Sequence, residues 1–211
     1  TKLALAEGDL IFFAADKWDI ACEVLGRLRL RVAEIQSLTQ GSEELDFLWV
    51  TEFPLLQHDP TEDKWNAVHH PFTRPHADDL PLLDEKRYGE MRAEAYDVVL
   101  NGVEIGGGSI RIHEPELQAK MFAVLGITEE QQQSQFGHLL RAFRLGAPPH
   151  GGIALGLDRL VMLICGEESI REVMAFPKNN RGQDLMSQSP SDVDLKQLRE
   201  LRIKLADKEK L

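Results

Sequence analysis

Two acidic residues, Asp97 and Glu104, lie on either side of an Asn101-Gly102 dipeptide that separates two apolar runs. Such a dipeptide is a strong signal for a two-residue β-hairpin turn, which would pair Val99 with Glu104. Because side chains alternate along a strand, Asp97 and Glu104 would share one face as diagonal neighbours, about 7–8 Å apart between backbone positions. Two carboxylates this close could hold magnesium together with substrate phosphates. Two solvated acids on an exposed sheet face are the simpler interpretation of this pattern alone.

A second candidate site lies in residues 151–163, which predict a buried strand, a glycine-bounded turn and a helix with Arg159 in its first turn. The glycines allow close approach of the backbone, and the start of the helix directs N–H groups and a positive dipole end to the same place. The guanidinium of Arg159 could grip a phosphate or stack on a base. A nucleotide pocket is one interpretation, and a glycine turn beside a surface arginine is the other.

Three consecutive glycines, at positions 106–108, fall inside the second strand of the predicted hairpin. Glycine weakens a strand, so a bulge or the close approach of a ligand is needed to explain them. Strict alternation would place Arg111 on the opposite face from Glu104, and a one-residue bulge at the glycines would return it to the same face. There Arg111 could bind a carboxylate through two parallel hydrogen bonds, or it could form an ion pair with a nearby acid.

The segment 56–89 is rich in His, Pro and Asp and has little periodicity. We expect a functional loop over residues 65–75 and a mobile one over 76–89. His69 and His70 are adjacent, yet no cysteine or carboxylate accompanies them at the spacing of a zinc site. A neutral imidazole could orient polar groups of a substrate, and a ring bonded to the backbone is the ordinary structural alternative.

The bulk composition sets limits on the class of protein. With 211 residues, 43% of them hydrophobic and 28% charged, the chain resembles a soluble globular protein with one core, or one core plus a small module. A net charge of −11 argues against a general nucleic-acid coat. We expect no membrane association, because no apolar run is long enough to span a bilayer. Cys22 and Cys165 are far apart and suggest buried thiols in a reducing compartment.

Hairpin strands interspersed with helices predict an α+β fold. We expect the following elements in chain order: a strand at 10–14, a helix at 18–35, a linker at 36–44, a buried strand at 47–53, a hairpin at 93–100 and 103–112, a helix from Pro115 to Gly126, a helix capped by Thr128 and Gln131 with Phe136, Leu139, Leu140 and Phe143 buried, and a charged helix at 191–208.

Taken in order, these segments resemble the motifs of class II aminoacyl-tRNA synthetases, and bacterial-type aspartyl-tRNA synthetases in particular. The matching segments are residues 47–54, 68–73, 95–97, 104–112, 151–163 (motif 3) and 175–178. The resemblance implies an antiparallel sheet flanked by helices. It identifies residues 1–40 as the C-terminal part of an insertion (GAD-like) domain and residues 45–211 as the C-terminal part of the class II catalytic domain.

The resemblance implies ATP-dependent activation of L-aspartate to aspartyl-adenylate and its transfer to tRNA, by a cytoplasmic homodimer that uses Mg²⁺. It assigns Mg²⁺ to Asp97 and Glu104, with Glu104 and Arg159 as catalytic residues. It assigns ATP to Glu104, Gly156, Leu157, Asp158 and Arg159, and aspartate to His69, His70 and Arg111. Motifs 1 and 2, the aspartate-binding lysine and the anticodon-binding barrel are missing from these residues, so we expect the 211-residue chain to be inactive alone.

Two other functions remain open. A class II synthetase for asparagine or lysine would share motif 3 and the acidic hairpin, although the His-His-Pro loop and the partial insertion domain favour the aspartate type. A non-catalytic paralogue acting as an interaction module would have no need of the acids and arginines retained here. The sequence does not distinguish strict charging of aspartate tRNA from charging of both aspartate and asparagine tRNAs.

Overall fold

The computed structural model describes residues 4–38 and 44–205, in two compact units, 1–45 and 46–211. The first unit contains α1 (Trp18–Ile35), with the bounds that the sequence predicts and with no buried residue. The strand predicted at 10–14 is wrong, because this segment is irregular and no described strand lies beside it to supply hydrogen bonds. Of the predicted linker, residues 39–43 lie outside the described residues.

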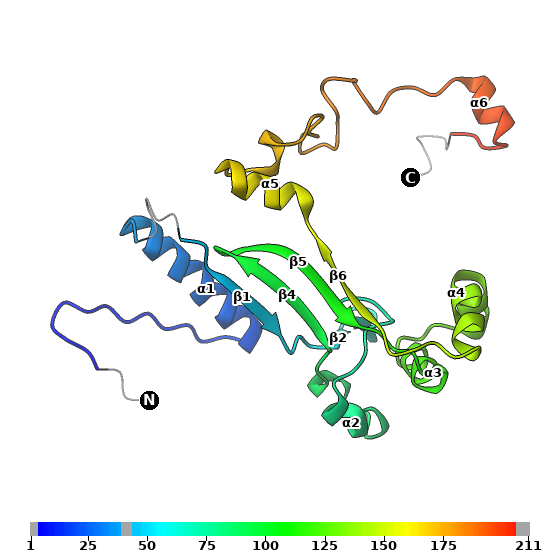
Figure 1. Ribbon diagram of the computed structural model, residues 1–211, viewed down its shortest axis with the longest axis horizontal. Helices are drawn as coiled ribbons and strands as arrows, with labels where there is room; N and C mark the ends of the chain where they lie inside the picture. The colour runs from blue at the N-terminus through cyan, green and yellow to red at the C-terminus, as the bar shows by residue number, and fades with distance from the viewer. Residues whose placement is uncertain (1–3, 39–43, 206–211) are drawn as a thin grey trace. The chain divides into compact units, whose positions relative to one another are not determined.

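A four-stranded antiparallel sheet organises the second unit, in the order β1-β4-β5-β6. Figure 1 shows these strands side by side. Their bounds are β1 (Phe47–Thr51), β4 (Ala95–Leu100), β5 (Val103–Ile110) and β6 (Gly151–Leu155). Helices α3 and α4 lie at one end of the sheet and α5 at the other (Figure 1). The predicted α+β class, with an antiparallel sheet flanked by helices, is confirmed.

The turn between β4 and β5 confirms the predicted hairpin. Asn101 and Gly102 both have positive φ angles, of 49° and 83°, as a tight two-residue turn requires. Leu100 pairs with Val103, and Val99 pairs with Glu104. The local sequence therefore fixes how the hairpin begins.

Burial of the two edge strands differs from the prediction. Both β1 and β6 were expected to be buried, yet every residue of each is exposed. Each pairs on one side only, with β4 or β5, and Trp49 of β1 remains 60% exposed although its ring packs edge-on against Tyr96. An apolar run predicts a strand, but its burial depends on which elements pack against it.

The segment expected to be an irregular loop is folded. It contains a second hairpin, β2 (Leu56–Asp59) with β3 (Lys64–Ala67), and the short helix α2 (Leu80–Asp84) between two 3₁₀ turns (Ala77–Asp79 and Tyr88–Glu90). Leu83 of α2 is buried in the hydrophobic core, which argues against the mobile segment predicted at 76–89. The other buried residues of the same hydrophobic cluster are Leu55, Leu56, Met91, Ala93, Ala95, Ile112 and Met121.

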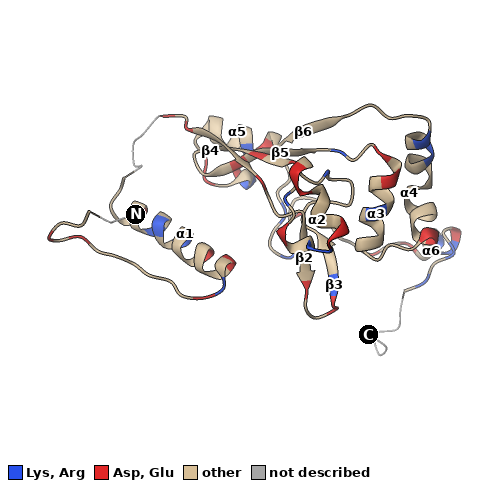
Figure 2. Ribbon diagram, turned by 90° about the horizontal axis from the view of Figure 1, so that it is seen from below, with Lys and Arg blue, Asp and Glu red and all other residues tan. Residues whose placement is uncertain are grey.

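Helices α3 (Pro115–Val124) and α4 (Glu129–Arg144) have the predicted ends. Gly126 has a φ of 68°, and Thr128 and Gln131 form the predicted capping box. The basic last turn of α4, blue in Figure 2, complements the negative end of the helix dipole. Of the predicted apolar stripe of α4, only Phe143 is fully buried, while Phe136, Leu139 and Leu140 are half-buried.

The C-terminal part contains α5 (Leu157–Cys165), a 3₁₀ turn (Ile170–Glu172) and α6 (Leu195–Glu200). Helix α6 is much shorter than predicted. None of its residues is buried, so its apolar stripe gains no tertiary packing, which supplies most of a helix's stability. Residues 206–208 of the predicted helix lie outside the described residues.

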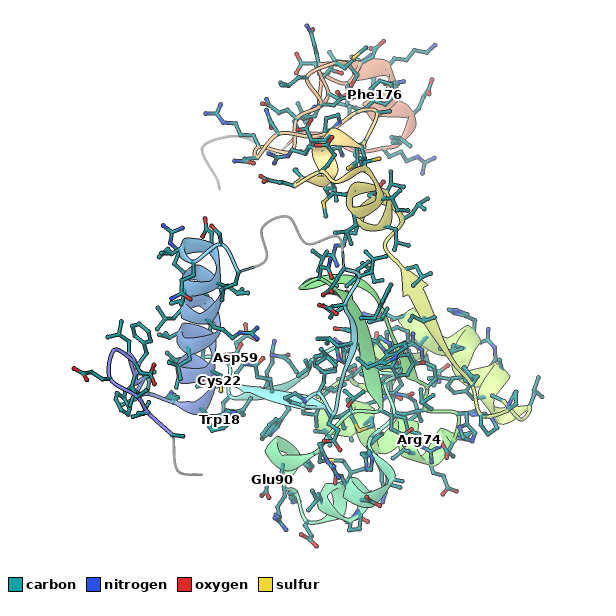
Figure 3. The ribbon with its side chains drawn as sticks, turned by 60° about the vertical axis from the view of Figure 1, so that its left-hand side comes forward. Trp18, Cys22, Asp59, Arg74, Glu90 and Phe176 are labelled. Atoms are coloured by element: carbon teal, nitrogen blue, oxygen red, sulfur yellow. The ribbon has the colours of Figure 1, made fainter. Side chains whose placement is uncertain are left out.

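Cysteine burial also differs from the prediction. Both Cys22, labelled on α1 in Figure 3, and Cys165 are exposed rather than buried. Within residues 4–38 and 44–205, no helix combines the length and apolar character needed to cross a bilayer.

Candidate active site

A β-bulge in β5 determines which side chains share a face of the sheet. Glu104 pairs with Val99, but the next pair is Gly106 with Val98, so Ile105 is an extra residue. Beyond the bulge, Asp97 pairs directly with Gly107, and the positions of Ser109 and Arg111 follow on the same face. The predicted bulge is therefore present, one residue before the glycines, and it reverses the parity that would have turned Arg111 away.

The carboxylates of Asp97 and Glu104 converge above Gly107. A Cβ atom added to Gly107 would collide with Oδ1 of Asp97 and would lie 3.7 Å from Oε1 of Glu104. Both oxygens thus lie near one point on the face of the sheet. The absence of a side chain at Gly107 leaves room for this pair, which is the arrangement predicted for a shared cation.

Gly106 and Gly108 have a different explanation from Gly107. A Cβ atom on Gly108 would lie 2.9 Å from Cα of Ile153, and one on Gly106 would lie 2.9 Å from the carbonyl oxygen of Ala154. Close approach of the β6 backbone, rather than of a ligand, requires glycine at these two positions.

Helix α5 delivers Arg159 to the acidic hairpin. The backbone N–H of Gly156, which precedes the helix, donates to the carbonyl oxygen of Ile105 at 2.8 Å. Nη1 of Arg159 donates to the carbonyl oxygen of Glu104 at 2.7 Å and lies 3.4 Å from Oε2 of the same residue. The side chains of Arg159 and Glu104 are about half exposed, at 46% and 50%, so a ligand can reach both.

The remaining residues predicted to bind ATP surround this contact. Gly156 is the N-cap of α5, and the aliphatic part of Arg159 packs over it, 3.5 Å from where its Cβ would be. Leu157 and Asp158 form the exposed first turn of the helix. The hydrogen bonds from Gly156 and Arg159 to β5 hold this turn of the helix beside Glu104.

Arg111 lies at the far end of the same sheet face. Its Nη1 donates to Oγ of Ser109 at 2.8 Å and lies 3.3 Å from Nδ1 of His70. Ser109 is almost fully buried, so it holds the guanidinium from the floor of the sheet. The sequence analysis missed Ser109, although its position two residues before Arg111 places both side chains on one face.

His70 is held in a tight turn as a neutral ring. Its Nδ1 accepts a hydrogen bond from the backbone N–H of Phe72 at 3.2 Å and lies 3.4 Å from Oγ1 of Thr73. Burial, followed by the positive charge of Arg111, lowers the pKa of His70. Because Nδ1 accepts these contacts, the ring carries its proton on Nε2 at neutral pH.

The structure separates the two adjacent histidines. The His69 ring packs edge-on against Phe53, with 4.9 Å between ring centroids, whereas His70 contacts Arg111. Within the described residues, no group of three or more His, Cys, Asp and Glu side chains could hold a metal ion. The pair formed by Asp97 and Glu104 would therefore need ligand oxygens or water to complete a coordination sphere.

A pocket of about 360 Å³ opens beside Arg111 and His70. Its other lining residues are Phe72, Leu139, Phe143 and His150. The sequence pattern predicted only a surface or packing role for His150. Its carbonyl oxygen accepts a hydrogen bond from the backbone N–H of Arg111 at 2.9 Å. The signal that could have identified it is its place directly before β6.

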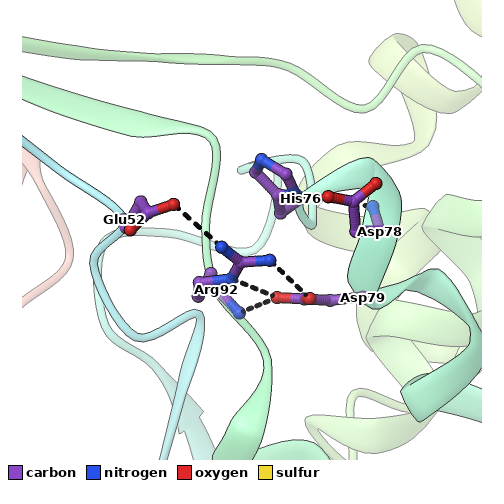
Figure 4. A network of polar contacts seen from close by, with 5 residues as sticks. All are labelled: Glu52, His76, Asp78, Asp79 and Arg92. Atoms are coloured by element: carbon purple, nitrogen blue, oxygen red, sulfur yellow. Dashed lines mark hydrogen bonds and ion pairs between the residues drawn. The ribbon is translucent and has the colours of Figure 1, made fainter.

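An ion pair between the buried Asp79 and the half-buried Arg92 fixes the loops around the start of β4. The carboxylate of Asp79 accepts three hydrogen bonds from Arg92, from the backbone N at 2.8 Å and from Nε and Nη2 at 2.9 Å each (Figure 4). Nη1 of Arg92 donates to Glu52, which follows β1 and has a φ of 59°. This network lowers the pKa of Asp79 and joins three loop segments next to the sheet.

Comparison with known proteins defines the family. Residues 25–180 match the tRNA synthetases class II (D, K and N). The chain belongs to this family.

Two curated relatives share about half or more of their aligned residues with this chain. The aspartate–tRNA(Asp/Asn) ligase of Methylacidiphilum infernorum is 58% identical over 206 residues, covering 97% of this chain and 34% of the relative. The aspartate–tRNA(Asp) ligase of Deinococcus radiodurans is 51% identical, covering 97% and 35%. The chain therefore spans about a third of the length of these relatives.

A solved structure shares the fold. The aspartyl-tRNA synthetase of Entamoeba histolytica superposes with a TM-score of 0.51 at 24% identity, covering 79% of this chain and 31% of that one. The antiparallel sheet with its flanking helices is common to both.

Proposed function

We propose that this chain forms part of the catalytic domain of an aspartate–tRNA ligase. The complete protein would activate L-aspartate with ATP to form aspartyl-adenylate and would then transfer the aspartyl group to tRNA. The observation that carries the proposal is that Asp97, Glu104 and Arg111 share one sheet face, with the two carboxylates close together and Arg159 bonded to Glu104. Membership of the family and the 58% identity to a ligase of this kind support it.

The reaction needs charge neutralisation and positioning more than proton transfer. The carboxylate of aspartate attacks the α-phosphate of ATP, the phosphoanhydride bond breaks and pyrophosphate leaves with the bonding electrons. Arg159, at the start of α5, would bind the phosphates and the adenine, and Gly156, Leu157 and Asp158 would border the nucleotide. Fixed charges aimed at the developing negative charge stabilise such a transition state.

The donor set fits magnesium. The converging oxygens of Asp97 and Glu104 are hard ligands, and two carboxylates leave positions for phosphate oxygens and water. When bound, magnesium neutralises phosphate charge and orients the phosphates. Besides its proposed contact with ATP, Arg159 would help to hold Glu104 in place, because it contacts both the backbone carbonyl and the carboxylate of that residue.

Recognition of aspartate would fall to Arg111 and His70. An arginine fork donates two parallel hydrogen bonds to a carboxylate, which favours aspartate over asparagine or lysine. Ser109 orients the fork from below, and the neutral ring of His70 beside it adds no second positive charge. His69, packed on Phe53, would support the loop rather than touch the amino acid.

Further parts of the proposal concern the whole protein. Residues 1–40 would belong to an insertion domain and residues 45–211 to the catalytic domain. Binding of tRNA, assembly as a homodimer and a cytoplasmic location stay predictions. The names of the relatives include both strict and dual tRNA specificity.

The test is amino-acid-dependent exchange of pyrophosphate into ATP by the full-length protein. We expect exchange with L-aspartate and Mg²⁺, and none above background with asparagine or lysine. Exchange driven by asparagine or lysine would replace the proposal with the corresponding relative, and absence of exchange with all three would favour a non-catalytic paralogue. The 211-residue chain alone is expected to be silent in the same assay.

A further inference from the structure

A buried glutamine lies behind the histidine turn. Gln118, on the core-facing side of α3, has no exposed surface. Its Nε2 donates a hydrogen bond to the carbonyl oxygen of Pro71 at 2.9 Å, while its Oε1 has no partner. Burying an amide with one oxygen unpaired is costly. An apolar side chain of similar size would avoid that cost, so the contact with Pro71 needs an explanation.

Pro71 lies in the middle of the turn that presents His70. The turn closes through the N–H of Thr73, which donates to the carbonyl oxygen of His70 at 3.1 Å. The N–H of Ile112 donates to the carbonyl oxygen of Phe72 at 2.9 Å and joins the turn to the segment directly after β5, which contains Arg111. Gln118 holds the same turn from the helix side, so the peptide after His70 is fixed by both neighbouring elements.

We propose that Gln118 is a positioning residue for the amino-acid site: its amide fixes the Pro71 carbonyl and thereby keeps Nδ1 of His70 against Arg111. The inference rests on the proposed function, because it assigns Gln118 to the aspartate side of that site. The side-chain hydrogen bond described for Gln118 goes to Pro71, so its effect passes through the backbone of the turn.

Loss of the hydrogen bond from Gln118 to Pro71 should affect aspartate binding but not ATP binding. Loss of the Gln118 donor frees the Pro71 peptide to rotate, and the distance of 3.3 Å between His70 and Arg111 is no longer enforced. The acidic hairpin and Arg159 lie at the other end of the sheet face and are held by their own contacts. Aspartate binding should therefore weaken while ATP binding is kept.

The test compares Gln118→Met with Gln132→Met in the full-length protein. Gln132, near the start of α4, is a matched control, since its Nε2 also donates to a backbone carbonyl, that of Ile127 at 2.8 Å, and it does not line the pocket beside Arg111. For Gln118→Met we expect the KM for aspartate to rise about tenfold, with the KM for ATP changed by less than about twofold. For Gln132→Met we expect neither constant to change. Equilibrium dialysis with labelled aspartate, without ATP, should give the same ratio.

A second variant protects the test against poor folding. Gln118→Glu keeps the shape of the side chain, and its carboxyl can donate to Pro71 only when protonated. Relative to wild type at the same pH, its aspartate defect should be larger at pH 8 than at pH 6. Equal losses of aspartate and ATP affinity in both Gln118 variants, or no loss of either, would overturn the inference. Absence of aspartate-dependent exchange in the wild type would instead overturn the proposed function.

Discussion

Arg159 contacts Glu104 at two points: its Nη1 donates a hydrogen bond to the carbonyl oxygen of Glu104 at 2.7 Å and lies 3.4 Å from the carboxylate oxygen Oε2. The first residue comes from the start of α5 and the second from the hairpin strand β5. One arginine thus holds both the backbone and the side chain of a residue proposed to bind magnesium. A substitution of either residue is expected to weaken the binding of both ATP and magnesium.

Glu104→Gln should weaken the magnesium dependence of adenylate formation far more than it weakens folding. The substitution removes a hard anionic ligand, whereas a half-exposed side chain contributes within about 0.5 kcal/mol to stability. A magnesium titration of pyrophosphate exchange beside a thermal melt of the full-length protein measures both. Glu116→Gln, at an exposed position of α3, is the control. An unchanged magnesium requirement would return Glu104 to the class of solvated surface acids.

Gly107→Ala should act on the metal pair without unfolding the sheet. The new methyl group would displace the carboxylate of Asp97, which is a flexible group that can move aside. We expect the magnesium concentration for half-maximal exchange to rise about tenfold or more, with a small change in melting temperature.

Two other glycines provide contrasts for this variant. Gly26→Ala, in α1, meets no atom within 4 Å and should leave the magnesium requirement unchanged, whereas Gly108→Ala meets the β6 backbone and should destabilise the protein. Equal effects of Gly107→Ala and Gly26→Ala on the magnesium requirement would contradict the proposed metal pair.

Arg111→Leu should raise the KM for aspartate at least about tenfold, because hydrogen bonds to a charged group contribute about 1.5–3 kcal/mol each. The KM for ATP should stay within about twofold, since Arg159 and the acidic pair are untouched. Steady-state exchange kinetics with each substrate varied in turn separate the two constants. Equal losses for both substrates would indicate collapse of the sheet rather than loss of the aspartate contact.

Asp79→Asn should destabilise the protein at pH 7 by about 1.5–3 kcal/mol, because a carboxylate that accepts three hydrogen bonds from Arg92 becomes neutral. The folded pKa of Asp79 lies below its ordinary value of 3.8. Its stabilising effect is therefore complete above that value and is lost as the pH falls through the folded pKa.

Thermal melts of wild type and variant between pH 7 and pH 3 check the sign of this effect. The difference between the two melting temperatures should be constant down to about pH 4 and should narrow below it. Asp78→Asn, at the exposed neighbouring position, is the matched control and should show little difference at any pH. A gap between Asp79→Asn and wild type that widens on acidification would contradict the assigned role of the ion pair.

Local patterns in the sequence determined most of the elements that carry the site. The bounds of α1, the Asn101-Gly102 turn and the capping box of Thr128 and Gln131 follow from contacts within a few residues, so short segments specify them. The resemblance in motif order identified Asp97, Glu104, Arg111 and Arg159.

Tertiary structure decided how those residues meet. The bulge at Ile105 sets the face of Arg111, and it depends on the register of β5 against β4 and β6. The exposure of β1 and β6, the folding of the 56–89 segment and the separation of His69 from His70 likewise depend on which elements pack together. The physical reason is that side-chain direction reverses with each single-residue shift in strand pairing, and such a shift is fixed by contacts between segments far apart in the chain.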